Sequence, residues 1–235
     1  MMNKYIKTDE YSYCLGMSLT VEALKHKANY IKEVVLSFKA NKNQQLDYLL
    51  DLCDKNNIIP RYDDNLISQL SLKENCYCIG IFKKFYTSLE TNKHIVLYRF
   101  NSFGELGTIF RSAVSFDFKD IVLVDSDIDY FDPRCIRASM GAIFHINVVK
   151  YNSLDDYFND NKKQIIIPFV SKSDKELNKL KLDDNYSLII SQNYFDLDEY
   201  KNNGYYLAHN NLEEISLSIR SSIILNYAFN QNLNR

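Results

Sequence analysis

The chain has 235 residues, of which 46% are hydrophobic and 25% are charged, and its formal net charge is −2 at pH 7. This length and apolar content can bury one large core or two modest ones, and they exclude a disordered chain. The small negative charge excludes a protein whose whole surface is basic, so any RNA binding must rest on a local patch. Candidate patches are Lys83 with Lys84 and Arg134 with Arg137, although such pairs are also common on a solvated face that binds nothing.

The five cysteines form no CxxC pair and no Cys/His cluster with zinc-ligand spacing. They are predicted to be buried free thiols, which are typical of a reducing compartment, and no metal site is expected. The first residues contain no apolar core of a signal peptide, and no apolar run approaches the roughly 20 residues that a membrane span needs. We therefore expect a soluble, cytoplasmic protein that does not act at a membrane.

Short β-rich runs alternate with helical patterns along the chain, which is typical of an α/β fold. Residues 1–85 are expected to form a small α/β domain. Within it, Leu46, Leu49, Leu50 and Cys53 share one helical face, as expected for a helix that packs on a sheet. The predicted elements are strands at 11–15, 31–38, 58–61 and 77–83 and helices at 19–27, 44–55 and 64–70.

A polar segment without periodicity at residues 86–93 is predicted to be a linker. Residues 94–235 are expected to form a second domain in which parallel strands are joined by helical crossovers. The predicted elements are strands at 95–99, 120–124, 146–149, 164–169, 187–190 and 204–207 and a last helix from 212 to about 229.

Three of the six glycines, Gly104, Gly107 and Gly141, lie within residues 101–145. A chain so poor in glycine is expected to use them where the backbone turns tightly or approaches another group closely. The pair Gly104-x-x-Gly107 lacks the third glycine of a dinucleotide-binding fingerprint, so a Rossmann oxidoreductase is not favoured. His145, at the end of the region, is predicted to be a polar residue at a strand edge rather than a general base.

Two runs in this region carry a family pattern. Gly104-Glu-Leu-Gly107-Thr-Ile-Phe-Arg111-Ser-Ala follows the predicted strand at 95–99, and Asp132-Pro-Arg-Cys-Ile-Arg137-Ala-Ser-Met-Gly141-Ala-Ile-Phe-His follows the next one. They resemble the first motifs of the SpoU/TrmH family of RNA ribose 2'-O-methyltransferases, in the SPOUT superfamily. In that family a turn of the type Asp-Pro-Gly-Asn-x-Gly-Thr precedes a helix with Arg-Thr/Ser-Ala.

The resemblance extends to residues 13–24, which are similar to the start of the small substrate-binding domain of many family members. It implies an RNA-binding-like N-terminal domain and a C-terminal SPOUT α/β domain with a trefoil knot, assembled as a homodimer. It also implies S-adenosylmethionine as cofactor and tRNA or rRNA, not DNA, as the partner. Arg111 would act at the target hydroxyl. The residues that the resemblance places at the cofactor are Gly107, Ser191, Asn193, Leu207, Ser216 and Leu217.

The later motifs depart from the family pattern. The second motif, Gly-x-Glu-x-x-Gly, corresponds to Ser191-Gln-Asn193-Tyr-Phe-Asp, which has neither the glycines nor the glutamate. In the third motif, Ser-Leu-Asn-Val-Ser-x-Ala, the asparagine is replaced by Ser216 and the alanine by Arg220. We expect the bulky side chains of Tyr194, Phe195 and Arg220 to fill the adenosine pocket.

Glu105 replaces the asparagine of the first motif and has two possible roles. It could pair with Arg111 and withdraw the arginine from RNA, since a guanidinium is a strong partner for a carboxylate. Alternatively, it could replace the carboxylate lost from the second motif, because an anion near a sulfonium is electrostatically favourable. Both roles place Glu105 beside Arg111 in the candidate catalytic set.

Two functions therefore stay open. The chain is either an S-adenosylmethionine-dependent tRNA or rRNA 2'-O-methyltransferase, or a catalytically inactive homologue that binds RNA or the ribosome without the cofactor.

Overall fold

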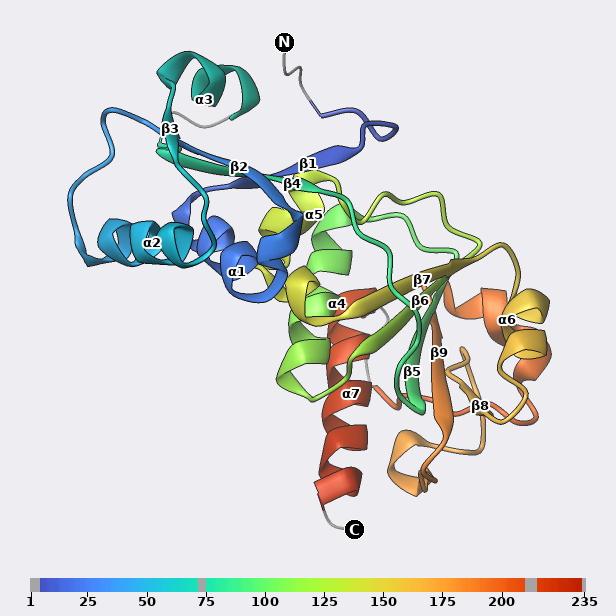
Figure 1. Ribbon diagram of the computed structural model, residues 1–235. Helices are drawn as coiled ribbons and strands as arrows, with labels where there is room; N and C mark the ends of the chain where they lie inside the picture. Colours follow the sequence, from blue (N-terminus) through green and yellow to red (C-terminus); the bar gives the residue numbers. More distant parts are fainter. Residues whose placement is uncertain (1–4, 72–74, 210–214, 234–235) are drawn as a thin grey trace. The chain divides into compact units, whose positions relative to one another are not determined.

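The computed structural model describes residues 5–71, 75–209 and 215–233. The chain folds into two compact units (Figure 1). The first unit comprises Met1–Phe85 with Asp129–His145, and the second comprises Tyr86–Ile128 with Ile146–Arg235. The structure thus differs from the predicted domain boundaries at residues 129–145, which pack with the first unit although both neighbouring segments belong to the second.

The first unit is built on a four-stranded sheet with the order β1-β4-β2-β3. Strands β1 and β2 each pair with β4 antiparallel, and β2 pairs with the short β3 in parallel. The predicted strand at 58–61 is wrong in its position, because pairing begins only at Arg61. The strands are β1 (Tyr11–Leu15), β2 (Ile31–Leu36), β3 (Arg61–Tyr62) and β4 (Cys78–Lys83).

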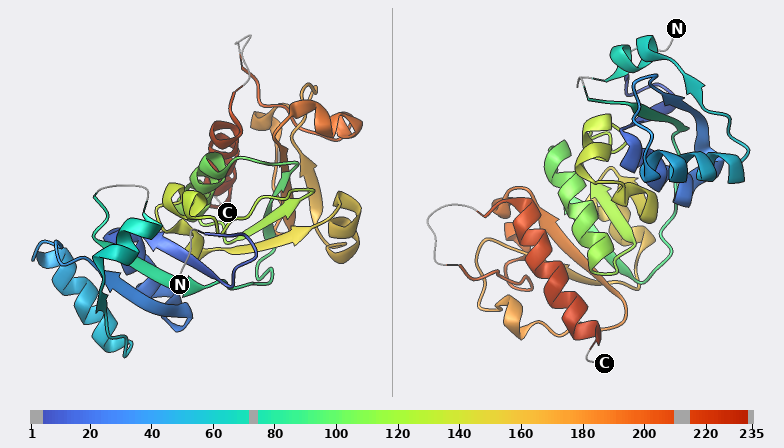
Figure 2. Two further views of the ribbon diagram at one scale, coloured as in Figure 1. Left: turned by 90° about the horizontal axis from the view of Figure 1, so that it is seen from above. Right: turned by 90° about the vertical axis from the view of Figure 1, so that its left-hand side faces the viewer.

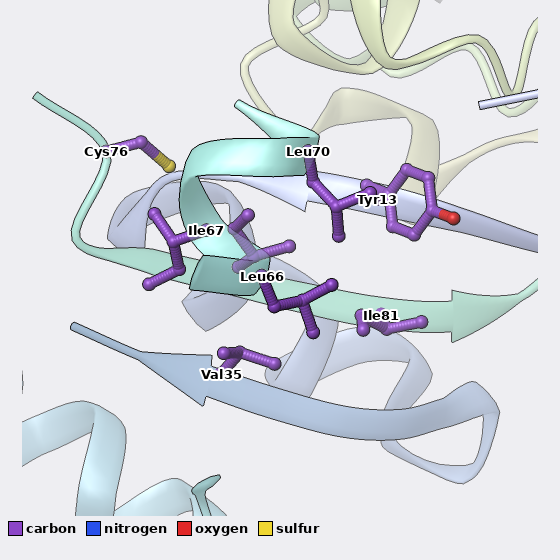
Figure 3. Close-up of a cluster of buried hydrophobic side chains, with 8 residues drawn as sticks. Tyr13, Val35, Leu66, Ile67, Leu70, Cys76 and Ile81 are labelled. Carbon is purple, nitrogen blue, oxygen red and sulfur yellow. The ribbon is translucent and has the colours of Figure 1, made fainter. Parts of the chain in front are cut away.

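Helices cover both faces of this sheet. Successive side chains of β2 point to opposite faces, so their contacts show which helices cover each face. Val34 packs with residues of α1 and α2, whereas Val35 packs with residues of α3. Figure 3 shows the second of these clusters, in which α3 lies against the strands. Asn43 caps α2 and Asp63 caps α3, each with a side-chain oxygen that accepts a backbone N–H. The helices are α1 (Met17–Lys27), α2 (Gln44–Lys55) and α3 (Asp64–Leu70), with a 3-10 turn η1 (Ala28–Tyr30).

Residues 129–145 contain α5 (Pro133–Ala138) and the 3-10 helix η2 (Ala142–His145). Aromatic rings attach them to the first unit: Phe131 lies 5.1 Å from Phe85 and Phe144 lies 5.5 Å from Phe82, between ring centroids. Gly141 has a φ of +91°, and a Cβ at this position would lie 2.8 Å from a carbon of Glu22 on α1. The close approach predicted for this glycine is confirmed.

The second unit contains a five-stranded sheet with the order β7-β6-β5-β9-β8, and all of its strand pairs are parallel. The prediction of parallel strands joined by crossovers is confirmed. The predicted strand at 204–207 is wrong, because this segment forms only isolated bridges between Tyr205 and Phe169 and between Tyr206 and Glu176. The strands are β5 (Lys93–Tyr98), β6 (Asp120–Val124), β7 (Asn147–Tyr151), β8 (Ile165–Pro168) and β9 (Tyr186–Ser191).

Helices α4 (Phe103–Ser115) and α7 (Leu217–Leu233) lie side by side against one face of this sheet (Figure 2). The other face packs on α6 (Leu154–Asp160) and the 3-10 helix η4 (Tyr194–Tyr200), and η3 (Leu177–Lys179) is a further 3-10 turn. The predicted start of the last helix, at 212, lies outside the described residues. Within the described residues, no helix has both the length and the apolar character needed to cross a membrane.

A buried polar chain crosses the second unit at the start of β5. His94 Nε2 donates to the carbonyl oxygen of Thr91 at 2.9 Å, and its Nδ1 lies 2.8 Å from the hydroxyl of Tyr157, which contacts the hydroxyl of Ser187 at 2.5 Å. Both imidazole nitrogens are thus satisfied in the neutral ring, and burial lowers the pKa of His94.

The stability of the protein should therefore fall as the pH is lowered through about 6.5, where an unfolded histidine gains a proton that folded His94 resists. We expect the melting temperature to decrease between pH 7.5 and 5.5, and to decrease less steeply in His94→Gln than in the wild type. Equal slopes for the two proteins would contradict a role for His94, whatever the absolute stability of the variant.

Candidate functional site

The carboxyl ends of β5, β6 and β9 lie at one edge of the parallel sheet, where ligands of open α/β sheets usually bind. Two non-glycine residues in the left-handed region follow the strands there: Arg99 after β5 and Asp125 after β6, each with φ of +50°. Arg99 Nε donates to Asp125 Oδ2 at 2.9 Å. Left-handed backbone of this kind is costly, and it is commonly found at functional sites.

Asp196 connects this edge to the segment after β9. Its Oδ1 lies 3.4 Å from the guanidinium of Arg99, and its Oδ2 accepts from the Ser191 hydroxyl at 2.9 Å. The same hydroxyl lies 3.1 Å from the carbonyl oxygen of Tyr98. Arg99, Asp125 and Asp196 were not among the sequence-based candidates, because nothing in the local pattern of each residue indicates that three separate segments converge.

Helix α4 begins at this edge, and its capping decides where Glu105 lies. The Ser102 hydroxyl caps the helix, and Glu105 lies in the first turn. The Oε1 atom of Glu105 accepts from the backbone N–H of Ser218 in the first turn of α7, at 3.4 Å. A carboxylate at a helix N-terminus is favourable because it faces unpaired N–H groups and the positive end of the dipole.

The turn predicted at Gly104 and Gly107 is instead the first two turns of α4. A Cβ on Gly104 would meet open space, so no close contact at this position requires glycine. Because the segment is helical, Glu105 and Arg111 lie about 9 Å apart along the helix axis and about 120° apart around it, and the Glu105 carboxylate accepts from Ser218 instead. The predicted pairing of these two side chains is therefore wrong. Within the described part of the chain, Arg111 has no ion pair and lies exposed on α4.

Arg220 of α7 is the most unusual side chain of this region, because it is 2% exposed. Its Nε donates to the carbonyl oxygen of Ile215 at 3.0 Å, and one terminal nitrogen donates to the carbonyl oxygen of Gln192 at 2.8 Å. The guanidinium thereby joins the segment that follows β9 to the segment that precedes α7. Of the predicted cofactor residues, Asn193 lies in the first of these segments and Ser216 in the second.

The predicted cofactor residues differ in their accessibility. Ser191, Leu207, Leu217 and Gly107 are buried, whereas Ser216 is exposed. Asn193 is also exposed, and its side-chain oxygen accepts from the backbone N–H of Phe195 at 3.1 Å. Phe195 is 70% exposed, so the prediction that its ring fills a pocket is wrong. The side chain of Tyr194 lies outside the described part of the structure.

The two lysines predicted to bind RNA lie in the first unit and differ strongly in their exposure to solvent. Lys84 is buried: its ammonium donates to the carbonyl oxygen of Lys7 at 2.7 Å, lies 3.5 Å from Asp129 and sits over the ring of Tyr5. The prediction that Lys84 binds RNA is wrong, because its ammonium is buried and bonded to groups inside the unit.

Lys83 is exposed and pairs with Glu10 at 2.6 Å, a hydrogen bond that raises the pKa of Lys83. The two predicted arginines are both exposed on α5. Arg134 forms a bidentate pair with Asp132, with N–O distances of 2.9 and 2.8 Å, whereas Arg137 has no ion pair among the described residues.

Glu22, His26 and His145 bring three ligand-type atoms within 4.8 Å of one another in the first unit. His145 Nε2 lies 3.1 Å from the Glu22 carboxylate, and the two imidazole rings are tilted by 46° with 3.8 Å between centroids. The contact with the carboxylate and the contact between the rings account for this cluster. His145 thus lies in η2 rather than at a strand edge, and it links that helix to α1.

The model of the SpoU rRNA Methylase family matches residues 92–191, which confirms the resemblance found in the sequence. No curated protein matches the chain by sequence. Among solved structures, the SpoU methyltransferase AviRb from Streptomyces viridochromogenes is similar with a TM-score of 0.80 and 12% identity, over 96% of this chain and 91% of that one.

An AdoMet-bound rRNA methyltransferase from Sinorhizobium meliloti is similar with a TM-score of 0.75 and 20% identity, over 93% of this chain and 87% of that one. An RNA 2'-O ribose methyltransferase gives a TM-score of 0.76 and 13% identity, over 95% and 90% of the two chains. AviRb has also been solved in complex with AdoMet. At these identities the similarity shows that the chain shares the α/β fold of these methyltransferases.

The Arg220 bridge predicts a large effect on stability. Arg220→Ala removes two charge-assisted hydrogen bonds and the packing of a buried side chain, so we expect a loss of about 2–4 kcal/mol in the free energy of unfolding. Arg220→Lys should recover only part of this loss, because an ammonium cannot reproduce the planar fork.

Ile219→Ala is the matched control on the same helix turn, since Ile219 is 54% exposed and should cost less than about 1 kcal/mol. Urea denaturation followed by circular dichroism measures all three variants. Equal losses for Arg220→Ala and Ile219→Ala would show that the bridge does not stabilise the fold.

Proposed function

We propose, on the premise that residues 92–191 belong to the SpoU rRNA methylase family, that the protein binds tRNA or rRNA and no longer transfers a methyl group from S-adenosylmethionine. The observation that carries this proposal is the position of Arg220. Its guanidinium occupies the space between the segments after β9 and before α7, where the family pattern places the cofactor.

The residues present do not fit S-adenosylmethionine. An adenine is read by backbone groups that approach it closely, but the bulky guanidinium of Arg220 lies at hydrogen-bond distance from the carbonyl groups of Gln192 and Ile215 and hinders such an approach. The cofactor also carries a positive sulfonium, which a buried guanidinium beside it would repel. Gly204 is the only glycine after Gly141, so the close backbone approach that the family obtains with glycines is not available here.

RNA binding remains compatible with the same site because Arg111 is exposed and unpaired within the described residues. A guanidinium is always protonated and presents a planar set of donors, so it is a poor base but a good ligand for phosphate. Glu105 does not neutralise it, because that carboxylate faces the first turn of α7. We therefore assign Arg111 to phosphate binding.

The proposed assembly is a homodimer with a knotted second unit. Ile219 and Ile223 lie one turn apart on α7 and are 54% and 40% exposed, and with Thr108 of α4 they line a groove. An apolar stripe of this kind supports burial against a second copy. The proposed knot is supported by the hydrogen bonds of Tyr205 and Tyr206 to residues 168–177, because these bonds hold the chain after β9 against an earlier segment.

The proposed location is the reducing cytoplasm. All five cysteines are free and buried. Burial raises the pKa of Cys53 to about 11, so this side chain stays a protonated thiol.

An active ribose 2'-O-methyltransferase is the second candidate, and the observation that favours it is the retention of an exposed Arg111 at the family position. Cofactor binding distinguishes the two candidates. We expect calorimetric titration with S-adenosylmethionine to give no heat up to millimolar concentration, with the same result for its demethylated product. Micromolar binding, about −8 kcal/mol, would contradict the loss of methyl transfer and favour the enzyme.

The RNA partner is tested separately with labelled total tRNA and fragments of rRNA in a filter-binding assay. We expect micromolar affinity for the wild type and a three- to tenfold loss in Arg111→Ala, because one phosphate contact is removed. Lys119→Ala is the matched control: it removes the same charge from an exposed position at the amino end of β6. No binding by the wild type, or equal losses in the two variants, would contradict the proposal.

A further inference from the structure

The first unit contains a cavity of about 370 Å³, and all of the residues that line it belong to this unit. Its walls come from three elements: Tyr13 and Leu15 of β1, Leu70 at the end of α3, and the exposed face of α5. Figure 3 shows Tyr13 and Leu70 within the cluster that forms its floor. The cavity is therefore built on the packed core of the unit.

The apolar part of the cavity is lined by aromatic rings. Tyr5 and Tyr13 both line it, with their ring centroids 6.3 Å apart and their planes at 82°. Tyr5 is held in place because its hydroxyl donates to the Asp129 carboxylate while Lys84 lies over its ring. Fixed rings of this kind suit a flat, unsaturated ligand, because stacking on them costs little conformational entropy.

The rim of the cavity is cationic on the side of α5. Arg134 and Arg137 both line it, one turn apart. The charge of Arg134 is already balanced by the bidentate contact with Asp132, which also lines the cavity. Arg137 is exposed and has no described ion pair, so its guanidinium is available for an anion at the rim. The cavity thus combines aromatic and apolar walls with one uncompensated cation.

We propose that this cavity binds one unpaired nucleotide of the RNA, with the base between the tyrosine and leucine side chains and a backbone phosphate on Arg137. Sequence-tolerant recognition of single-stranded RNA generally uses this combination of aromatic rings and arginine. The volume suits a base with its ribose, since pockets for small ligands start at about 300 Å³. The inference rests on the proposed RNA binding and adds to it a defined nucleotide site in the first unit.

The charge at the rim is tested by anisotropy with a fluorescein-labelled single-stranded RNA of twelve random nucleotides. Arg137→Glu should weaken binding at least tenfold. Lys42→Glu makes the same change in net charge at an exposed position in the loop before α2 and should weaken binding less than threefold. Equal losses in the two variants would show that only the net charge matters and would overturn the proposal.

The position of the base is tested with a fluorescent reporter, which is possible because the chain contains no tryptophan. In Leu15→Trp the reporter lies in the cavity wall, and RNA should quench its emission. In Tyr48→Trp it lies on the outer face of α2, where Tyr48 is 44% exposed, and the emission should stay constant. Quenching in the second variant but not in the first would overturn the proposal.

A free mononucleotide carries the same base and phosphate groups as a nucleotide within RNA. The last experiment therefore distinguishes binding of RNA from binding of a mononucleotide. Unlabelled 5'-UMP and 5'-AMP are titrated into the Leu15→Trp protein. We expect no quenching at concentrations where the RNA saturates, because the neighbouring nucleotides of the RNA supply further contacts. Quenching by a mononucleotide at the same concentration as by RNA would overturn the assignment to RNA. If the wild type binds no RNA, the proposed function fails; if it binds RNA and the variants behave like their controls, only the cavity proposal fails.

Discussion

The buried guanidinium of Arg220 determines the character of the candidate site, because it holds together two chain segments that are more than twenty residues apart. Its hydrogen bonds reach the carbonyl groups of Gln192 and Ile215, and the side chain is almost fully removed from solvent. Its Nε and one terminal nitrogen find partners, as a buried charge requires of most of its donors. The bridge therefore connects the end of β9 to the start of α7, and in our proposal it does so where a cofactor would otherwise bind.

Glu105 also makes a structural contact, although the family pattern suggested a role for it at the cofactor or beside Arg111. Its carboxylate lies at the N-terminus of α7, where it accepts a backbone N–H and faces the positive end of the helix dipole. Together with Arg220, it connects α4, α7 and the segment after β9 through contacts made entirely within the protein. Arg111, on another face of α4, is left exposed, which is why RNA binding survives in our interpretation while methyl transfer does not.

Residues 129–145 connect β6 to β7 but pack with the first unit, and this detour creates the second candidate site. The aromatic contacts of Phe131 and Phe144 anchor the segment, and α5 then contributes Arg137 to the cavity above Tyr13. Lys84 becomes an interior residue for the same reason, because Asp129 and the carbonyl of Lys7 surround its ammonium. Of the basic residues predicted to bind RNA in the first unit, Lys84 is therefore buried, whereas Arg134 and Arg137 of α5 are exposed.

The sequence by itself determined the elements with strong local signals. The helix at 44–55 and the parallel strands at 120–124 and 187–190 follow from periodicity and β-branched content, and the family motif follows from the order of residues 104–111. Only the tertiary structure decided the rest. The conformation at Gly104 depends on capping by Ser102, which makes this segment a helix and separates Glu105 from Arg111. The segment at 204–207 has strand-like composition but finds no continuous partner. The burial of Arg220 and Lys84 and the cavity beside α5 arise from contacts between residues far apart in the chain, and local patterns carry no information about such contacts.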